Sequence, residues 1–416
     1  MCGVKMQDPA IHNSSIHTVL LVGYGGANNT GADVRLMKAI EDVRECFGKC
    51  TRVTVATLDK VKTARIVRED KNTRVVRIPK LFLWRIFREA YRHDVTMLVE
   101  GSTFVDHWSC SLFYLFMWAA FSAKVAGRKS VAYAVDAGKL GNWNRRLAVA
   151  IANRMAFVIT RTEAAKAKLE TMGVTAPIHA TADLAVGFLP EPRPLPRAVG
   201  APLRVAVAPI EFFHWPVRLR GWGKRQDCYS WPYYFTWTEQ RKLSSSRMIG
   251  IYSRFIERCA QEYGAKVTIV AMEELDTRIC EKILETLPAH LTQQIEIHSS
   301  SVSDPFTIVR VLRNSDYLIT SRYHASVLSL PAGVPQIAIG HDDRLETIYE
   351  EYGLRDAYFL KYTEEALEER LWQAFLSLMA SGAAIQRNLL RLHEEYFLPR
   401  RRLNIALLTK LSMSLE

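Results

Sequence analysis

The sequence lacks long hydrophobic runs, paired cysteines and metal-ligand spacings. Its longest apolar run, residues 112–121, is too short to cross a bilayer as a helix, and residues 1–17 contain no apolar core of signal-peptide length. The seven cysteines include no Cys-x-x-Cys pair, and Cys46 and Cys50 have no histidine at zinc-binding spacing. We therefore expect reduced thiols, no metal site, and a cytoplasmic protein that is soluble or peripheral to the inner face of the membrane.

The composition is that of a globular protein large enough for two domains. Of its 416 residues, 49% are hydrophobic and 24% are charged, and the formal net charge is +12. The positive charge favours phosphorylated substrates, polyanions or an anionic membrane surface, although a basic surface without a particular partner explains it equally well. No zinc-finger, RNP-like or basic-region pattern is present, so we expect no nucleic acid as a partner.

Strand and helix patterns alternate along the chain, which predicts parallel sheets covered by helices. The stretch 189–202 contains five prolines and is typical of a linker between domains. We therefore predict an α/β fold with a first domain at 17–188, a second domain at 203–383 and a helical tail at 384–416. A cleft is expected between the two domains.

The segment 315–344 is the most informative part of the sequence. A buried strand at 317–320 is followed by a turn with Arg322 and His324, a helix at 325–330, a Gly-Val-Pro break and a further strand. This βαβ unit places the polar turn at the carboxyl edge of a parallel sheet, where open α/β folds bind ligands. A guanidinium and an imidazole at the start of a helix suit an anion that must also exchange a proton.

A second polar loop follows the predicted strand at 18–22. Its candidate ligand-binding residues are Asn28, Asn29, Thr30, Gly31 and Asp33. Short side chains at an open helix N-terminus can hold a phosphate or a sugar, and Asp33 can accept from a sugar hydroxyl. A simple capped turn, with Asn29 or Thr30 as N-cap, is the alternative. The pattern is not Gly-x-Gly-x-x-Gly, so we infer no nicotinamide or flavin.

The segment 211–237 combines aromatic side chains with cations and holds four of the nine tryptophans. Such a mixture suits stacking on a sugar ring, a phosphate-bearing donor or an interfacial membrane contact, and core packing explains part of it. Because the segment begins at the end of the second domain's first strand, we expect a loop over the cleft. His214 and Arg218 are its candidate substrate contacts.

Four segments, taken in order, resemble the polysaccharide pyruvyl transferase family. They are the glycine-rich stretch 23–33, the stretch 99–106, the strand–Arg–Thr–Glu–helix stretch 158–174, and 315–353 with Arg322-Tyr323-His324. The resemblance covers residues 17–355, and only the fourth segment is specific by itself. The sequence departs from the family pattern at Glu100-Gly101-Ser102, where a glycine run is usual, and at Thr162, where an Asp is common.

The resemblance implies two Rossmann-like domains in a glycosyltransferase-B-like arrangement. It also implies transfer of a pyruvyl group from phosphoenolpyruvate onto two hydroxyls of a sugar, which forms a cyclic ketal. Family members act on cell-wall polymers, exopolysaccharides or lipid-linked precursors. The expected partners are therefore phosphoenolpyruvate on the second domain and a sugar or lipid-linked saccharide on the first, where Glu100, Gly101 and Ser102 are candidate contacts. No cofactor is expected besides the donor substrate.

This chemistry gives roles to the polar residues of the fourth segment. Phosphoenolpyruvate carries about three negative charges within a few ångströms, so several cations should converge on it. We hypothesise that Arg322 clamps its carboxylate or phosphate and that His324 is the general acid or base. A structural hydrogen-bonding role is the alternative for His324.

Four further residues are candidate substrate contacts, namely Arg161, Ser321, His341 and Arg344. Arg161 could equally be a helix-start arginine paired with Glu163. His341 and Arg344 follow the next strand, and an exposed loop accounts for them equally well.

Two other functions stay open besides a pyruvyl transferase of envelope or exopolysaccharide synthesis. A glycosyltransferase of the same architecture would use a nucleotide-sugar donor and release a nucleoside diphosphate. A non-enzymatic carbohydrate- or membrane-binding protein would keep its binding after loss of both Arg322 and His324. The residues give no indication of an oligomeric state.

Overall fold

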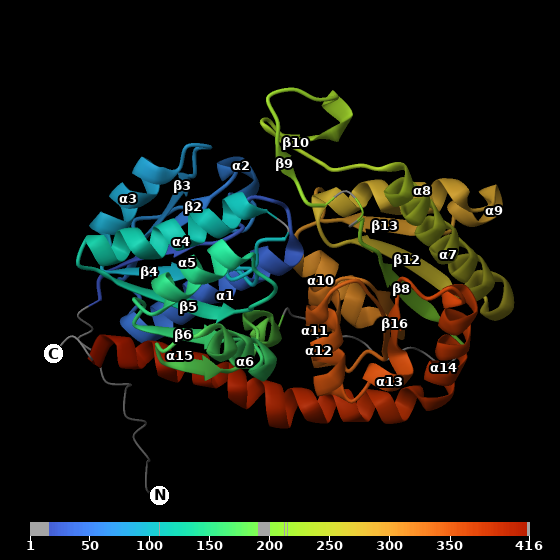
Figure 1. The fold of residues 1–416 in the computed structure, drawn as a ribbon. Coiled ribbons are helices and arrows are strands. Elements are labelled where there is room, and N and C mark those ends of the chain that lie inside the picture. The colour runs from blue at the N-terminus through green and yellow to red at the C-terminus, as the bar shows by residue number, and fades with distance from the viewer. Residues whose placement is uncertain (1–15, 108, 190–199, 212, 214, 414–416) are drawn as a thin grey trace, which may run out of the picture.

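The computed structural model describes residues 16–107, 109–189, 200–211, 213 and 215–413. It contains two parallel sheets covered by helices, which form two halves that stand side by side (Figure 1). The α/β class predicted from the alternation of strands and helices is confirmed. Most of the predicted linker, 190–199, lies outside the described residues.

The first half is built around a seven-stranded parallel sheet in the order β3-β2-β1-β4-β5-β6-β7. Val19 of the interior strand β1 lies opposite Val53 on one side and Val95 on the other, and all three are buried, because helices cover both faces of the sheet. The strands are β1 (Thr18–Val22), β2 (Arg52–Thr57), β3 (Thr73–Arg77), β4 (Val95–Leu98), β5 (Lys129–Val135), β6 (Phe157–Thr160) and β7 (Ile178–Ala180). The helices are α1 (Thr30–Phe47), α2 (Lys60–Thr63), α3 (Leu83–Arg92), α4 (Cys110–Val125), α5 (Asn142–Ala152), α6 (Glu163–Met172) and the 3-10 helix η1 (Leu184–Gly187).

The second half repeats this architecture with a six-stranded parallel sheet in the order β13-β12-β8-β14-β15-β16. The predicted βαβ unit is present, since β14 and β15 pair in parallel and flank α11. The strands are β8 (Arg204–Ala208), β12 (Lys266–Ala271), β13 (Glu296–Ser299), β14 (Tyr317–Thr320), β15 (Gln336–Gly340) and β16 (Phe359–Lys361). The helices are α7 (Glu239–Tyr263), η3 (Glu274–Asp276), α8 (Thr277–Thr286), α9 (Ala289–Thr292), α10 (Pro305–Asn314), α11 (Tyr323–Ser329), η4 (Leu330–Ala332), α12 (Asp343–Tyr352) and α13 (Arg355–Tyr358).

The aromatic segment predicted as a loop over the cleft forms a small antiparallel sheet. Its strands β9 (Arg218–Leu219), β10 (Cys228–Ser230) and β11 (Tyr233–Tyr234), with the short η2 (Arg225–Asp227), project above both halves (Figure 1). We call residues 215–237 the flap. The rings of Trp215, Tyr229 and Phe235 pack on one another with centroids 5.6–5.9 Å apart. The Tyr229 hydroxyl lies 2.8 Å from that of Tyr24, which ties the flap to the first half.

A long helix returns the chain from the second half to the first. It comprises α14 (Leu367–Leu392), a π-helical turn η5 (His393–Phe397) and α15 (Leu398–Met413), and it runs beneath both halves (Figure 1). The predicted tail at 384–416 is therefore part of a helix that begins at Leu367, and residue 384 lies inside α14. Helix α15 buries Leu407, Leu408 and Leu411 against α1 and the first sheet, and it thereby completes the core of the first half.

The loop after β1 docks on the second half through backbone hydrogen bonds. The Thr30 N–H donates to the carbonyl of Met272 at 2.9 Å, and the Glu274 N–H donates to the carbonyl of Asn28 at 3.0 Å. Arg65 donates to the carbonyl oxygens of four consecutive residues of the second half. The two halves are thus held together along one side of the space between their sheets.

None of the helices in the described residues has both the length and the apolar character needed to cross a bilayer. The cysteines within the described residues are free thiols, and Cys259 and Cys280 are buried in the core of the second half.

The contact of α15 with the first half depends on a buried ion pair. Arg401 Nη2 lies 2.6 Å from both carboxylate oxygens of Asp42, and the Tyr133 hydroxyl donates to the same carboxylate at 2.8 Å. We predict that Arg401→Ala lowers the free energy of unfolding by about 3 kcal/mol, because Asp42 is left as a buried charge without its cation. Urea denaturation measures this change.

Arg402→Ala is the matched control, since Arg402 is the exposed neighbour of Arg401. Its effect should stay within about 0.5 kcal/mol. Equal effects of the two substitutions would contradict a structural role for the pair.

Candidate functional site

A small cavity of about 120 Å³ lies where loops of the second sheet face the first half, and we call it the cleft. The turn after β14 supplies Arg322, the first turn of α11 supplies His324, and the turn after β15 supplies His341. The loops after β1 and β4 supply Asn29 and Glu100 from the first half. All these loops lie at the carboxyl ends of parallel strands, where open α/β sheets bind ligands.

Arg322 is held by two carboxylates of its own half. Its Nη1 lies 3.0 Å from Glu273 Oε2, and its Nη2 pairs with Asp276. Its Nε is buried without a hydrogen-bond partner among the described residues. Buried polar groups rarely lack a partner, so this N–H is available to a ligand. The role of Arg322 as an anion clamp stays a prediction.

His324 contacts the first half on both sides of its ring. Its Nε2 lies 3.7 Å from Asp183 Oδ2 and has no hydrogen-bond partner among the described residues. Gly31 approaches the other side so closely that a β-carbon there would lie 2.1 Å from Nδ1. A histidine of the second half is therefore positioned by the first half, and Gly31 contributes by having no side chain.

Asp183 is the centre of a buried ion network below the cleft. Its Oδ2 accepts from Arg35 Nη1 at 2.7 Å and from Arg161 Nη1 at 2.9 Å. Arg161 also donates to Asp136 through Nε and Nη2, at 2.9 and 2.7 Å. The Arg161 guanidinium carbon lies 3.7 Å from the ring centroid of Tyr323, the residue before His324. The network thus fixes the backbone that carries the imidazole.

The network also sets the protonation states of Asp183 and His324. Burial by itself would raise the pKa of Asp183, but Arg35, His324 and Arg161 hold this pKa well below its usual range. Burial lowers the pKa of His324, and Asp183 offsets only part of that shift. At neutral pH the carboxyl group is therefore ionised and the imidazole is neutral, which is the form that accepts a proton.

A second histidine and carboxylate line another wall of the cleft. Asp342 caps α12 by accepting from the backbone N–H of Arg344 at 3.1 Å, and its Oδ2 lies 2.5 Å from Arg344 Nη2. His341 Nε2 lies 3.7 Å from Asp342 Oδ2. Burial lowers the pKa of His341 to about 4, so its imidazole is neutral at pH 7. Arg344 is the charged member of this wall.

The cleft brings together predicted residues from both halves of the chain. Those that line it are Asn29, Glu100, Ser102, Ser321, Arg322, His324, His341 and Arg344. Asn29 is also the N-cap of α1, since its side chain accepts from the Ala32 N–H at 3.1 Å. The capped turn considered as the alternative role of this loop is therefore present as well. Contact of these residues with a substrate stays a prediction.

Three predicted residues of the loop after β1 lie outside the cleft. Asn28, Thr30 and Asp33 line a separate, much smaller cavity beside Arg65. Successive side chains at the start of a helix point in different directions, and of the five residues predicted here only Asn29 lines the cleft. Burial raises the pKa of Asp33 to about 7, so its carboxyl group titrates near neutrality away from the cleft.

Arg161, Gly101 and Arg218, which were also predicted, do not line the cleft. Arg161 is buried in the ion network, and Gly101 packs against its guanidinium. The alternative partner of Arg161, Glu163, binds an arginine of α15 instead. Arg218 is exposed on the flap, and His214 lies outside the described residues.

Sequence reasoning found Glu100 but missed three other carboxylates of the site, Asp183, Glu273 and Asp342. Glu273 follows β12 and Asp342 follows β15, so the rule that selected Arg322 and His324 would also have found both. Asp183 follows β7, but no strand was predicted there, so the rule could not select it. Among the described residues, no group of three or more His, Cys, Asp or Glu side chains is placed to hold a metal ion.

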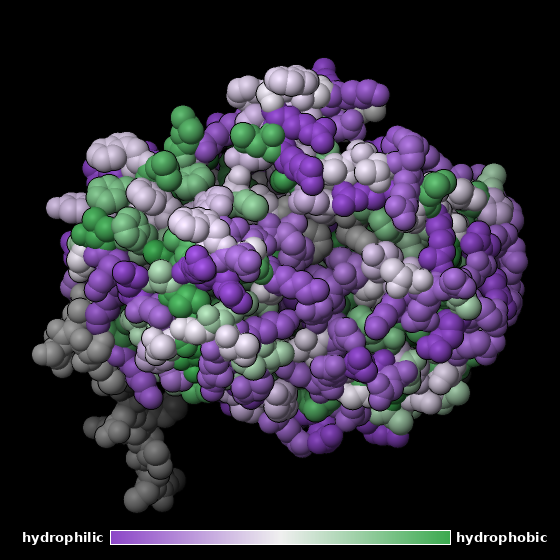
Figure 2. All heavy atoms as spheres, viewed as in Figure 1, coloured by the Kyte–Doolittle hydropathy of each residue, from purple (hydrophilic) through white to green (hydrophobic). Residues whose placement is uncertain are grey.

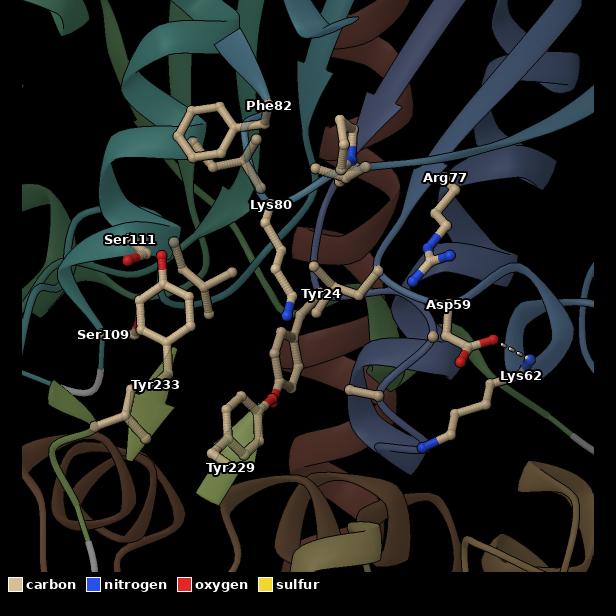
Figure 3. Close-up of a pocket in the computed structure, with 18 of the residues that line it drawn as sticks. Tyr24, Asp59, Lys62, Arg77, Lys80, Phe82, Ser109, Ser111, Tyr229 and Tyr233 are labelled. Atoms are coloured by element: carbon tan, nitrogen blue, oxygen red, sulfur yellow. Dashed lines mark hydrogen bonds between the residues drawn. The ribbon is translucent and has the colours of Figure 1, made fainter. Parts of the chain in front are cut away.

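A larger cavity of about 920 Å³ opens between the first half and the flap, and we call it the flap cavity (Figure 3). Figure 3 shows Arg77 and Lys80 of the first half beside Tyr24 and Tyr229, whose hydroxyls meet. The flap cavity is a neighbour of the cleft because several residues line both. These shared residues are Tyr24, Ser109, Leu112, Trp215 and Glu273.

Comparison with known proteins identifies the family. A family model described as polysaccharide pyruvyl transferase matches residues 60–343, which is more than half of the chain. The protein belongs to the polysaccharide pyruvyl transferase family. The resemblance inferred from four segments is confirmed, although the first segment, 23–33, lies before the matched range. No curated protein sequence matches the chain.

Solved structures confirm the predicted glycosyltransferase-B-like fold. The UDP-N-acetylglucosamine 2-epimerase of Neisseria meningitidis has a TM-score of 0.58 at 9% identity, with 94% of this chain and 100% of that chain covered. A 2-epimerase assigned in Listeria monocytogenes has a TM-score of 0.57 at 13% identity, with 90% and 91% covered. HepE of Anabaena has a TM-score of 0.55 at 13% identity, with 95% and 98% covered. At these identities the likeness concerns the fold alone.

The two departures from the family pattern have local explanations. Thr162 caps α6 by accepting from the Ala165 N–H at 3.1 Å, which Asp at this position does equally well. Glu100 accepts from the backbone N–H groups of Tyr24 and Ser102, each at 3.3 Å. The carboxylate therefore organises two loops of the first half at the edge of the cleft.

The contact between Gly31 and His324 can be tested by adding one methyl group. We predict that Gly31→Ala keeps the fold but lowers turnover about 100-fold, because the β-carbon displaces the imidazole. Turnover and the His324 ring resonances in NMR measure the two effects. Gly221→Ala is the control, since a β-carbon there meets nothing within 4 Å. Unchanged turnover in Gly31→Ala would show that the contact does not position the histidine.

Proposed function

We propose that the protein transfers the pyruvyl group of phosphoenolpyruvate onto two hydroxyls of a sugar, forming a cyclic ketal, in the cytoplasmic synthesis of a cell-envelope polysaccharide or exopolysaccharide. Membership of the pyruvyl transferase family supports this reaction class. The observation that carries the proposal is His324, which lines a cleft of small-metabolite size and has its Nε2 3.7 Å from the ionised carboxylate of Asp183.

The cleft is the proposed donor site. Its volume of about 120 Å³ suits a three-carbon phosphate, because pockets for drug-sized ligands hold roughly 300–1,000 Å³. Arg322 and Arg344 bring two fixed positive charges to it. Arg322 would keep its pairing with Asp276 and offer Nε and Nη1 to the donor, with Glu273 giving way.

The proposed chemistry uses the neutral imidazole of His324. His324 takes the proton of the first sugar hydroxyl while the hydroxyl oxygen attacks C2 of phosphoenolpyruvate, and it delivers this proton to C3, which becomes a methyl group. Phosphate leaves C2 with its bonding electrons, and the second hydroxyl adds to C2 and loses its proton to the phosphate. The products are the ketal and inorganic phosphate. General acid–base assistance of this kind contributes about 100- to 10,000-fold in rate.

The flap cavity is the proposed acceptor site. Its aromatic side chains suit a sugar ring, and Lys62, Arg77 and Lys80 suit an anionic group next to that sugar. Trp215 and Tyr24 line both cavities, so an acceptor bound there presents its hydroxyls toward the cleft.

The donor can be tested by kinetics with Arg322→Lys. The lysine keeps the charge but loses the planar fork, so we predict a KM for phosphoenolpyruvate that rises about tenfold while kcat changes less. Phosphate release and calorimetric binding of phosphoenolpyruvate measure the effect. Arg204→Lys is the matched control, because Arg204 pairs with Asp316 at the opposite end of the same sheet.

Two outcomes would redirect the assignment. Release of a nucleoside diphosphate from a nucleotide sugar would favour the glycosyltransferase alternative. Sugar binding without turnover, unchanged by loss of both Arg322 and His324, would favour a non-enzymatic binding protein.

The pH dependence tests the role of His324 as a base. Burial lowers the pKa of this imidazole below 6.5, so the neutral form persists to lower pH and is lost only as the pH falls through the lowered pKa. We predict that kcat/KM is level near pH 7 and declines on the acid side below 6.5. His324→Ala should abolish this decline on the acid side, together with most of the turnover of phosphoenolpyruvate.

Asp33 also titrates near neutrality, so Asp33→Asn serves as the control and should leave the acid limb in place. A decline on the alkaline side that depends on His324 would make the residue a general acid instead.

A further inference from the structure

The outer surface of α3 carries an exposed aromatic stripe. Trp84, Phe87 and Tyr91 recur three and four residues apart, so they share one face of the helix. Trp84 is 72% exposed, and its ring stacks on that of Phe87 with centroids 6.0 Å apart. Leu81, just before the helix, is 88% exposed and extends the stripe. Side chains of this size are normally buried, so a whole stripe of them on the surface indicates an interaction site.

The neighbouring helix α4 continues this surface. Tyr114, Trp118, Phe121 and Val125 recur at helical spacing on its outer side, and three of them are exposed. Trp118 joins the two helices, because its indole N–H donates to the carbonyl of Leu83 at 2.8 Å. Figure 2 shows hydrophobic atoms gathered over this part of the first half. We call the outward sides of α3 and α4, with Leu81, the aromatic face.

The aromatic face is bordered by positive charge. Arg85, Arg88 and Arg92 belong to α3, and Lys124 belongs to α4. Glu89 is the only acidic residue of either helix, and its side chain is fully buried and shared by three arginines. No exposed carboxylate on these two helices therefore opposes an approaching anionic surface.

We propose that the aromatic face docks the protein on an anionic lipid bilayer. Trp and Tyr partition to the boundary between headgroups and hydrocarbon, and each Lys or Arg near an anionic bilayer strengthens binding about fivefold. Together they match such a boundary, with aromatic rings at the headgroup level and cations among the lipid phosphates. A twofold contact between two copies of this face would instead bring the two basic borders together, which like-charge repulsion opposes.

Membrane docking would place the flap cavity at the bilayer surface. Phe82, Arg85, Leu112 and Leu115 of α3, α4 and the turn before α3 line the flap cavity, so its wall and the aromatic face share the same elements. A lipid-linked saccharide could enter without leaving the membrane. This step rests on the proposed function, whereas the membrane contact itself does not.

Co-sedimentation of the full-length protein with vesicles tests the contact without any substrate. Vesicles of phosphatidylcholine mixed with phosphatidylglycerol should bind the protein, and vesicles of phosphatidylcholine alone should bind it much less. The double variant Trp84→Ser, Tyr91→Ser should weaken binding about tenfold or more. Lys124→Gln should weaken it about fivefold, and added salt should weaken it further.

The control variants lie on the second half. Leu243→Ser replaces a residue of α7 that is 71% exposed, and Lys242→Gln removes a charge beside it. Both should bind vesicles as the parent protein does. Thermal unfolding of every variant shows that the fold is kept.

Three outcomes would overturn the proposal: no binding to anionic vesicles, equal binding to both kinds of vesicle, or equal loss in the aromatic-face and control variants. Self-association that Trp84→Ser abolishes, without vesicle binding, would assign the face to a second copy of the chain. Vesicle binding combined with no turnover of phosphoenolpyruvate would uphold the membrane contact and reject the proposed reaction.

Discussion

The buried carboxylate of Asp183 is the interaction on which the site depends. Two arginines of the first half and a histidine of the second converge on it, and both arginines are buried. An ion network of this kind costs desolvation energy and gains it back only when every partner is in place. The carboxylate that keeps Arg35 and Arg161 paired therefore also helps to position His324.

This arrangement explains why the cleft belongs to neither half alone. The imidazole comes from the second sheet, but the glycine and the carboxylate that position it come from the first. On the opposite wall, Asn29 of the first half forms a backbone bridge with Glu273, the partner of Arg322. Rigid positioning by groups fixed before the substrate arrives is a general source of catalytic rate.

The sequence predicted those features that depend on local patterns. Apolar runs and helical spacing located the parallel sheets, and the βαβ rule located Arg322 and His324 at a sheet edge. The flap was mistaken for a loop, because its strands are two or three residues long and carry no strand signal. Asp183 was missed, since its meeting with His324 is a tertiary contact over a long sequence separation. The loop after β1 was predicted as a unit, but of its five predicted residues only Asn29 lines the cleft.

The returning helix has a consequence for how the protein is made. The first sheet leaves the ribosome early, yet the leucines of α15 that complete its core are synthesised after the entire second half. Until then, part of the first half's apolar surface stays uncovered, and exposed apolar surface during synthesis favours aggregation. The order of events in biogenesis is thus reversed with respect to the sequence: the half that begins the chain is the last to be finished.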